Sequence, residues 1–115
     1  MPGTEFDTQE RELAMIVIRN VFRLKFGKAK EAVALFKEGI AIQKRSGAGM
    51  EFQTRLLTDV TGPFYTVVME VTAPSMSAFE AGAPKLMGDK DWQANYQKVS
   101  ALVESGYREI FSAIE

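Results

Sequence analysis

The chain contains no cysteine and no histidine among its 115 residues. Without cysteine there is no disulfide, no zinc–thiolate site and no thiol nucleophile. Without histidine there is no His-based catalytic triad and no usual axial ligand for haem. No calcium-loop pattern of the D-x-D-x-D-G type occurs either. The sequence therefore predicts no metal site and no cofactor.

An excess of charge of one sign is also missing. Fourteen Lys and Arg side chains are balanced by fifteen Asp and Glu, which gives a formal net charge of −1. Binding to a phosphate backbone needs a basic surplus. The one basic cluster, Lys44 and Arg45, is typical of a solvated helix end. We therefore expect no nucleic-acid partner.

Long hydrophobic runs are absent as well. The longest, residues 13–18, is much shorter than the roughly 20 apolar residues that a membrane-spanning helix needs. The first residues are acidic and lack the basic region of a signal peptide. The sequence predicts no membrane partner, and a cytoplasmic location is the expectation.

The composition is that of one ordinary globular domain, with 46% hydrophobic and 25% charged residues. The length suits a single domain. Residues 1–12 are polar and contain Pro2 and Gly3, which predicts a flexible N-terminal arm. Residues 13–115 are expected to form the domain.

Hydrophobic periodicity predicts the elements of the N-terminal half. Residues 13–26 are apolar at most even positions, interrupted by Asn20, which is typical of a strand. Apolar residues then follow helical spacing until the glycine-containing segment 46–49. Two β-rich runs, residues 52–56 and 64–71, flank turn-forming residues and predict a hairpin.

The C-terminal half predicts two helical stretches and a strand. Ser75, or Ser77 with Glu80, caps a helix that Gly82 and Pro84 make short or broken. A further helix begins near residue 90 and ends at residues 105–106, before a strand over residues 107–114. The resulting order, β-α-β-β-α-β, predicts a ferredoxin-like α+β fold: a four-stranded antiparallel sheet with helices on one face.

Several of the predicted strands are apolar on both sides, which such a sheet does not need if its second face meets water. Val17 and Val21 lie opposite the main apolar row of the first strand, and Tyr107 and Phe111 opposite that of the last. A second copy of the same sheet is the simplest cover for this face. We therefore expect a homodimer.

The chain resembles the dimeric α/β barrel superfamily, and within it NIPSNAP-like and antibiotic-biosynthesis-monooxygenase-like domains. The resemblance rests on residues 17–28, 56–70 and 102–110 and covers nearly the whole of 13–115. It implies a ferredoxin-like fold that closes into a barrel as a dimer. The superfamily includes cofactor-independent oxygenases, haem-handling enzymes and isomerases, and the missing histidine argues against haem degradation.

Six residues are candidates for a ligand site. Oxygenases of this superfamily carry an Asn on the first strand and a Trp facing the cavity, a pattern that Asn20 and Trp92 match. Each also has a structural interpretation: Trp92 in the core, and Asn20 as a satisfied polar group or a bulge. The remaining candidates are Arg19, Arg55 and Glu70, charged residues inside strands, and Tyr65, a possible phenol donor. An ion pair between Glu70 and an arginine of the partner subunit is the alternative for the charged three.

Three functions follow from these observations. The first is binding of a small organic molecule in a cavity between sheet and helices. The second is cofactor-independent oxygenation or isomerisation of an aromatic or polyketide-like substrate, and the third a non-catalytic interaction module. A cavity of a few hundred Å³ lined by Asn20, Trp92 or an arginine favours the first two over the third.

Overall fold

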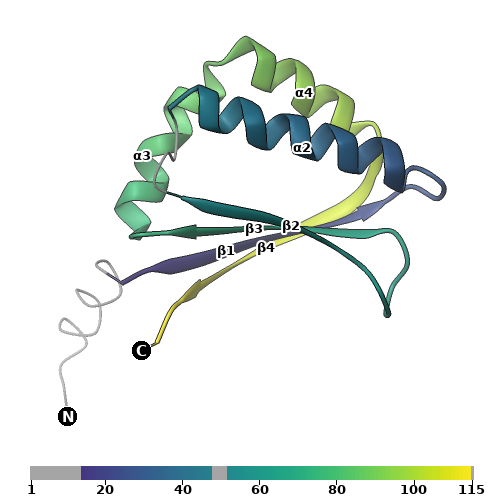
Figure 1. The fold of residues 1–115 in the computed structure, drawn as a ribbon, viewed down its shortest axis with the longest axis horizontal. Coiled ribbons are helices and arrows are strands. Elements are labelled where there is room, and N and C mark those ends of the chain that lie inside the picture. Colours follow the sequence, from purple (N-terminus) through teal and green to yellow (C-terminus); the bar gives the residue numbers. More distant parts are fainter. Residues whose placement is uncertain (1–13, 48–51, 115) are drawn as a thin grey trace.

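The computed structural model describes residues 14–47 and 52–114. The predicted arm, residues 1–12, lies outside them. The elements are β1 (Ile16–Leu24), α2 (Ala29–Arg45), β2 (Gln53–Thr58), β3 (Thr66–Ala73), α3 (Met76–Met87), α4 (Lys90–Ser100) and β4 (Val103–Ser112). The predicted ferredoxin-like α+β fold is confirmed, with two helices between β3 and β4 (Figure 1).

The four strands form one antiparallel sheet in the order β2-β3-β1-β4. Figure 1 shows α2 and α4 side by side over one face of the sheet, with α3 at one end. The opposite face carries no element of the described chain. No helix among the described residues is long and apolar enough to cross a membrane.

The core lies between the sheet and the helices, in two clusters. Leu24 of β1 packs with Phe36 of α2 in one, and Ile18 of β1 packs with Val71 of β3 in the other. Asn20 lies on β1 between Ile18 and Leu24 and points to the same side. A buried polar residue thus separates two apolar clusters.

One predicted boundary in the C-terminal half is wrong, the end of the last helix at residues 105–106. Gly106 lies inside β4 instead of ending a helix. A Cβ at this position would stand 3.0 Å from Cδ1 of Phe22. The glycine makes room for an aromatic ring. The helix predicted to be short or broken by Gly82 and Pro84 runs from Met76 to Met87 with Pro84 inside it. Ser75 caps its start by accepting a hydrogen bond of 3.1 Å from the Ala78 amide.

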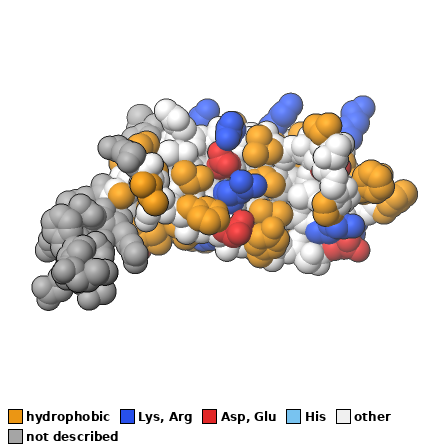
Figure 2. Space-filling view, turned by 90° about the horizontal axis from the view of Figure 1, so that it is seen from below, with side chains coloured by type: hydrophobic (Ala, Val, Ile, Leu, Met, Phe, Trp, Pro, Cys, Tyr) orange, Lys and Arg blue, Asp and Glu red, His pale blue; other side chains and the backbone are white. Residues whose placement is uncertain are grey.

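The face away from the helices is made by the odd-numbered residues of β1 and β4 and by their neighbours on β2 and β3. Figure 2 shows this face, with blue and red side chains alternating across its middle and orange ones on both sides. Its apolar members include Val21, Tyr107 and Phe111, as the alternation of the strands predicted. Tyr107 is 62% exposed and Phe111 49% exposed in the single chain.

Candidate ligand-binding site

A cavity of about 280 Å³ lies between the helix-bearing face of the sheet and helices α2 and α4. Most of its lining is apolar or aromatic. The lining residues are Asn20 and Phe22 of β1, Phe36 and Gly39 of α2, Met69 of β3, Met87 of α3, Trp92, Asn95, Tyr96, Val99 and Ser100 of α4, and Val103 and Arg108 of β4. The cavity lies between the sheet and the helices, at the place where Asn20 separates the two apolar core clusters.

Asn20 projects into this cavity from the middle of β1 and is only 7% exposed. Its Oδ1 accepts a hydrogen bond of 2.7 Å from Nε of Arg108, which lies directly opposite it on β4. That bond fixes the amide orientation, because the oxygen faces the arginine. The Nδ2 group has no acceptor among the described residues, so it is a free donor at the cavity wall.

Arg108 is the only charged side chain among the described residues that line the cavity. Its guanidinium is held from two sides, by Asn20 Oδ1 and by the ring of Phe79 on α3, 5.7 Å from its Cζ. The terminal Nη groups have no acceptor within the described parts of the chain. A guanidinium fixed by Nε and by stacking presents these groups to an oxyanion or a carboxylate.

Sequence reasoning missed Arg108. Its place in the strand could have identified it. Arg108 alternates with Gly106 and Ile110 along β4, so its side chain lies on the face of the sheet that the helices cover.

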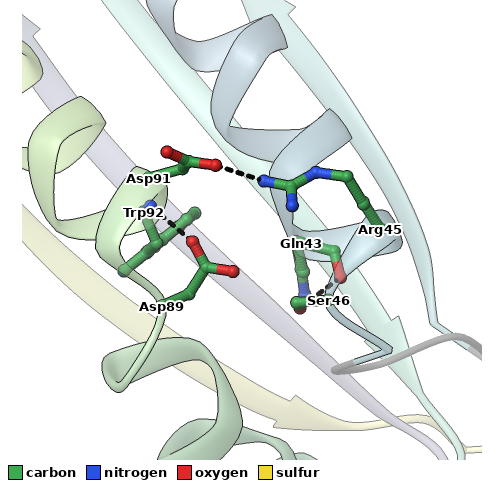
Figure 3. A network of polar contacts seen from close by, with 6 residues as sticks. All are labelled: Gln43, Arg45, Ser46, Asp89, Asp91 and Trp92. Atoms are coloured by element: carbon green, nitrogen blue, oxygen red, sulfur yellow. Dashed lines mark hydrogen bonds and ion pairs between the residues drawn. The ribbon is translucent and has the colours of Figure 1, made fainter.

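Trp92 enters the cavity from the first turn of α4. Asp89 caps this helix by accepting a hydrogen bond of 3.0 Å from the Trp92 amide. The next residue, Asp91, accepts a hydrogen bond of 2.9 Å from Arg45 at the end of α2. Figure 3 shows both contacts: the Arg45–Asp91 pair joins the start of α4 to the end of α2, and the Asp89 cap lies at the start of α4 beside Trp92.

Asn95, one turn further along α4, is 5% exposed and anchors the helix pair. Its Nδ2 donates to the backbone oxygen of Leu35 on α2 over 3.0 Å. A Cβ at Gly39 would lie 2.9 Å from Asn95 Oδ1 and 3.5 Å from Cζ3 of Trp92. Gly39 therefore gives α4 room to approach α2.

Sequence reasoning also missed Asn95, a polar residue on the stripe of Trp92 and Val99. A polar residue at helical spacing within an apolar stripe is a signal for a buried hydrogen bond.

Arg19, Arg55 and Glu70 lie on the other face of the sheet and do not join Asn20 and Trp92. Nε of Arg55 donates to Glu70 Oε1 over 2.8 Å, and Nη1 of Arg19 lies 4.0 Å from Glu70 Oε2. The ion pairs of Glu70 are therefore formed within one chain.

Tyr65 stands apart from both groups. It precedes β3 with a φ of 60°, a conformation that residues other than glycine rarely adopt. Its ring packs on Phe26 at 5.0 Å between centroids and lines a shallow surface hollow with Phe64. Of the six predicted site residues, only Asn20 and Trp92 share the cavity.

The cavity combines an apolar body with donors at one wall. Phe22, Phe36 and Met69 supply apolar surface, and Asn20 Nδ2 and the Arg108 guanidinium supply N–H groups beside it. No Asp, Glu or Lys belongs to the lining among the described residues. Such a site suits a small molecule with an aromatic or aliphatic body and a carboxylate, phenolate or carbonyl oxygen.

Solved structures show the same fold. A NIPSNAP family protein from Agrobacterium tumefaciens is 29% identical over 89% of this chain and 88% of its own, with a TM-score of 0.78. A second NIPSNAP family protein of unknown function from that organism is 23% identical over 88% and 89%, with a TM-score of 0.76. SnoaB, a cofactor-independent oxygenase from Streptomyces nogalater, is 16% identical over 89% and 95%, with a TM-score of 0.67.

No protein-family model matches the chain, and no curated protein matches it by sequence. The comparison with solved structures therefore supports the fold. The similarity extends over most of both chains in each comparison. The chain thus has the ferredoxin-like fold of NIPSNAP family proteins and of an antibiotic-biosynthesis-type oxygenase, and is similar in sequence to the first of these.

Proposed function

We propose that the chain is a homodimer in which each subunit binds a small aromatic anion in the cavity between its sheet and helices. The observation that carries the ligand proposal is the pair formed by Asn20 and Arg108. Their 2.7 Å hydrogen bond leaves Asn20 Nδ2 and the Arg108 Nη groups unpaired beside apolar walls. Unpaired donors next to an apolar cavity favour a ligand that brings its own acceptor.

The size of the cavity narrows the ligand class. About 280 Å³ is at the lower end of the volumes of ligand pockets and suits one or two fused rings. Trp92 and Phe36 offer aromatic faces, and Arg108 sets the preferred sign of charge. The homodimer rests on the apolar open face, where Tyr107 and Phe111 are exposed in the single chain.

Isothermal titration calorimetry with two matched probes tests the ligand proposal. Naphthoate carries a carboxylate on the fused ring, and naphthylmethylammonium carries a cation on the same ring. We expect naphthoate to bind more tightly. Arg108→Gln should weaken naphthoate binding by about 10- to 100-fold, the loss of one charge-assisted contact.

The matched control is Lys44→Gln, which removes one positive charge from the exposed end of α2. It should leave both probes unaffected. Equal affinities for the two probes, or an Arg108→Gln variant that binds naphthoate as the wild type does, would contradict the proposal. Mass spectrometry of molecules retained by the purified protein then identifies the natural ligand.

A second candidate is cofactor-independent oxygenation or isomerisation of an aromatic substrate. The shared fold with SnoaB and the donors of Asn20 and Arg108 favour it, since such donors stabilise an enolate or phenolate. The described lining holds no carboxylate or lysine to take up a proton. Without such a base, the substrate itself would have to be a phenol acidic enough to ionise on binding. We therefore rank ligand binding above catalysis. An oxygen electrode with naphthol as substrate separates the two: oxygen uptake lost in Asn20→Ala supports catalysis.

A further inference from the structure

One end of the buried Asn95 amide is left without a partner. Its Nδ2 donates to the backbone oxygen of Leu35 over 3.0 Å, and because a backbone carbonyl can only accept, this bond fixes which end of the amide is the oxygen. No donor within residues 14–47 and 52–114 reaches that oxygen, Oδ1. Asn95 is 5% exposed, so Oδ1 is a largely shielded acceptor that still lacks a hydrogen bond.

The neighbours of Asn95 Oδ1 place it at the cavity. A Cβ on Gly39 would stand 2.9 Å from this oxygen and 3.5 Å from Cζ3 of Trp92, so the oxygen lies beside the glycine and the indole ring. Gly39 and Trp92 both line the cavity. Asn95 also borders a second hollow between the same two helices, lined mostly by charged residues, but Gly39 and Trp92 do not. The oxygen is therefore on the cavity side of its side chain.

Asn95 Oδ1 is also open to the cavity. Among the described residues, Nε of Arg19 is the one side-chain nitrogen or oxygen that is both sealed from solvent and without a hydrogen bond. Asn95 Oδ1 lacks a hydrogen bond too, so it is not sealed. A group in the cavity can reach it.

The cavity thus has donors on one wall and an acceptor on another. Asn20 Nδ2 and the Arg108 Nη groups are N–H donors on the sheet, and Asn95 Oδ1 is an acceptor on α4. Tyr96 and Ser100 also line the cavity from α4, but both are exposed and can exchange hydrogen bonds with water. Asn95 Oδ1 is therefore the shielded side-chain acceptor in the described lining that is left for a ligand.

We propose that Asn95 selects a ligand with a hydrogen-bond donor on its ring, apart from its anionic group: a hydroxylated or aminated aromatic acid. The inference rests on the proposed anion-binding function and deepens it by naming the second polar group of the ligand. The anion meets Arg108 and Asn20 on the sheet, while the hydroxyl or amino group donates to Asn95 Oδ1 on α4. A ligand without that donor leaves the shielded oxygen unpaired in the complex, which weakens its binding.

Two contacts prepare Asn95 for this role before a ligand arrives. The bond to the Leu35 carbonyl oxygen holds the amide, so its oxygen does not have to be ordered on binding. Gly39 leaves the oxygen uncovered, since even a methyl group there would stand within 2.9 Å of it. The acceptor is therefore fixed and accessible at once.

Calorimetry with matched probes tests the proposal on the wild-type protein. Three hydroxynaphthoic acids carry the hydroxyl at different positions of the ring remote from the carboxylate, and each has a methoxy analogue that keeps the oxygen but cannot donate. We expect at least one hydroxy acid to bind about 10-fold more tightly than its methoxy analogue and than plain naphthoate. If no hydroxy acid binds more tightly than its methoxy analogue, the role of Asn95 is wrong.

Asn95→Leu identifies the acceptor, because it removes the amide and keeps a side chain of similar size. The variant should bind the preferred hydroxy acid and its methoxy analogue with equal affinity. Gln97→Leu is the matched control, the loss of an amide from an exposed position of α4 outside the cavity lining. It should keep the wild-type preference. The wild-type comparison needs no variant, so it decides the matter even where circular dichroism shows that Asn95→Leu does not fold.

The outcomes separate this inference from the proposed function. A wild type that binds none of the naphthoates overturns the anion site, and the role of Asn95 with it. A wild type that binds naphthoate through Arg108 but does not prefer any hydroxy acid overturns the role of Asn95 alone. An Asn95→Leu variant that keeps the preference does the same, since another group then accepts the hydroxyl.

Discussion

The close contact between Gly39 and Asn95 leads to a prediction for Gly39→Ala. Whether this change lowers or raises the free energy of unfolding should depend on the residue at position 95. In Gly39→Ala the new Cβ would stand 2.9 Å from Asn95 Oδ1. Asn95 is 5% exposed and its Nδ2 is held by the Leu35 carbonyl oxygen, so it has little freedom to move aside. Overpacking of this kind costs about 1–3 kcal/mol, whereas alanine in place of a helical glycine stabilises by about 1 kcal/mol.

We therefore expect Gly39→Ala to lower the free energy of unfolding by up to about 2 kcal/mol in the wild-type background. In an Asn95→Ala background the obstacle is gone and only the helix-propensity gain remains. There Gly39→Ala should raise the free energy of unfolding by about 1 kcal/mol. The two changes are thus coupled by at least about 1 kcal/mol, with a reversal of sign.

Urea unfolding followed by circular dichroism measures all four members of this cycle. The protein concentration must be the same throughout, because the stability of an oligomer depends on it. Asn95→Ala alone should cost about 1–3 kcal/mol for the lost buried hydrogen bond. An effect of Gly39→Ala that is equal in both backgrounds would refute the idea that the glycine exists to admit Asn95.

Two further predictions concern the start of α4 and use the same urea assay. Asp89→Ala removes the cap on the Trp92 amide and should lower the free energy of unfolding by about 1 kcal/mol; no loss would mean that another group replaces the cap. Arg45→Ala breaks the ion pair with Asp91, whose two side chains are 58% and 71% exposed. It should change the free energy of unfolding by less than about 1 kcal/mol, and a larger loss would show that this pair holds the two helices together.

The fold was predictable because its signals are local and agree with one another. Alternation in β1, helical spacing in α2 and the Asp59 turn each matched the structure, where Asp59 Oδ1 accepts a hydrogen bond of 2.9 Å from the Thr66 amide. The errors arose where a residue serves packing. Gly106 reads as a helix stop, but its missing side chain accommodates Phe22 from a neighbouring strand.

The site was predictable only in part. Asn20 and Trp92 were identified, but Arg19 was grouped with them although it is adjacent to Asn20 on one strand and therefore points to the opposite face. For Arg55 and Glu70 the face depends on strand register, which the sequence does not display. Arg108 depends on register too, since only its position opposite Asn20 turns a surface arginine into part of the cavity.

We have proposed that the cavity between sheet and helices binds an aromatic anion through Asn20 and Arg108. A crystal structure of the protein with naphthoate tests it most directly. We expect the naphthoate ring beside Trp92 and a carboxylate oxygen within hydrogen-bonding distance of the Arg108 guanidinium and Asn20 Nδ2. Naphthoate seated on the open face of the sheet, or in the surface hollow near Tyr65, would contradict it.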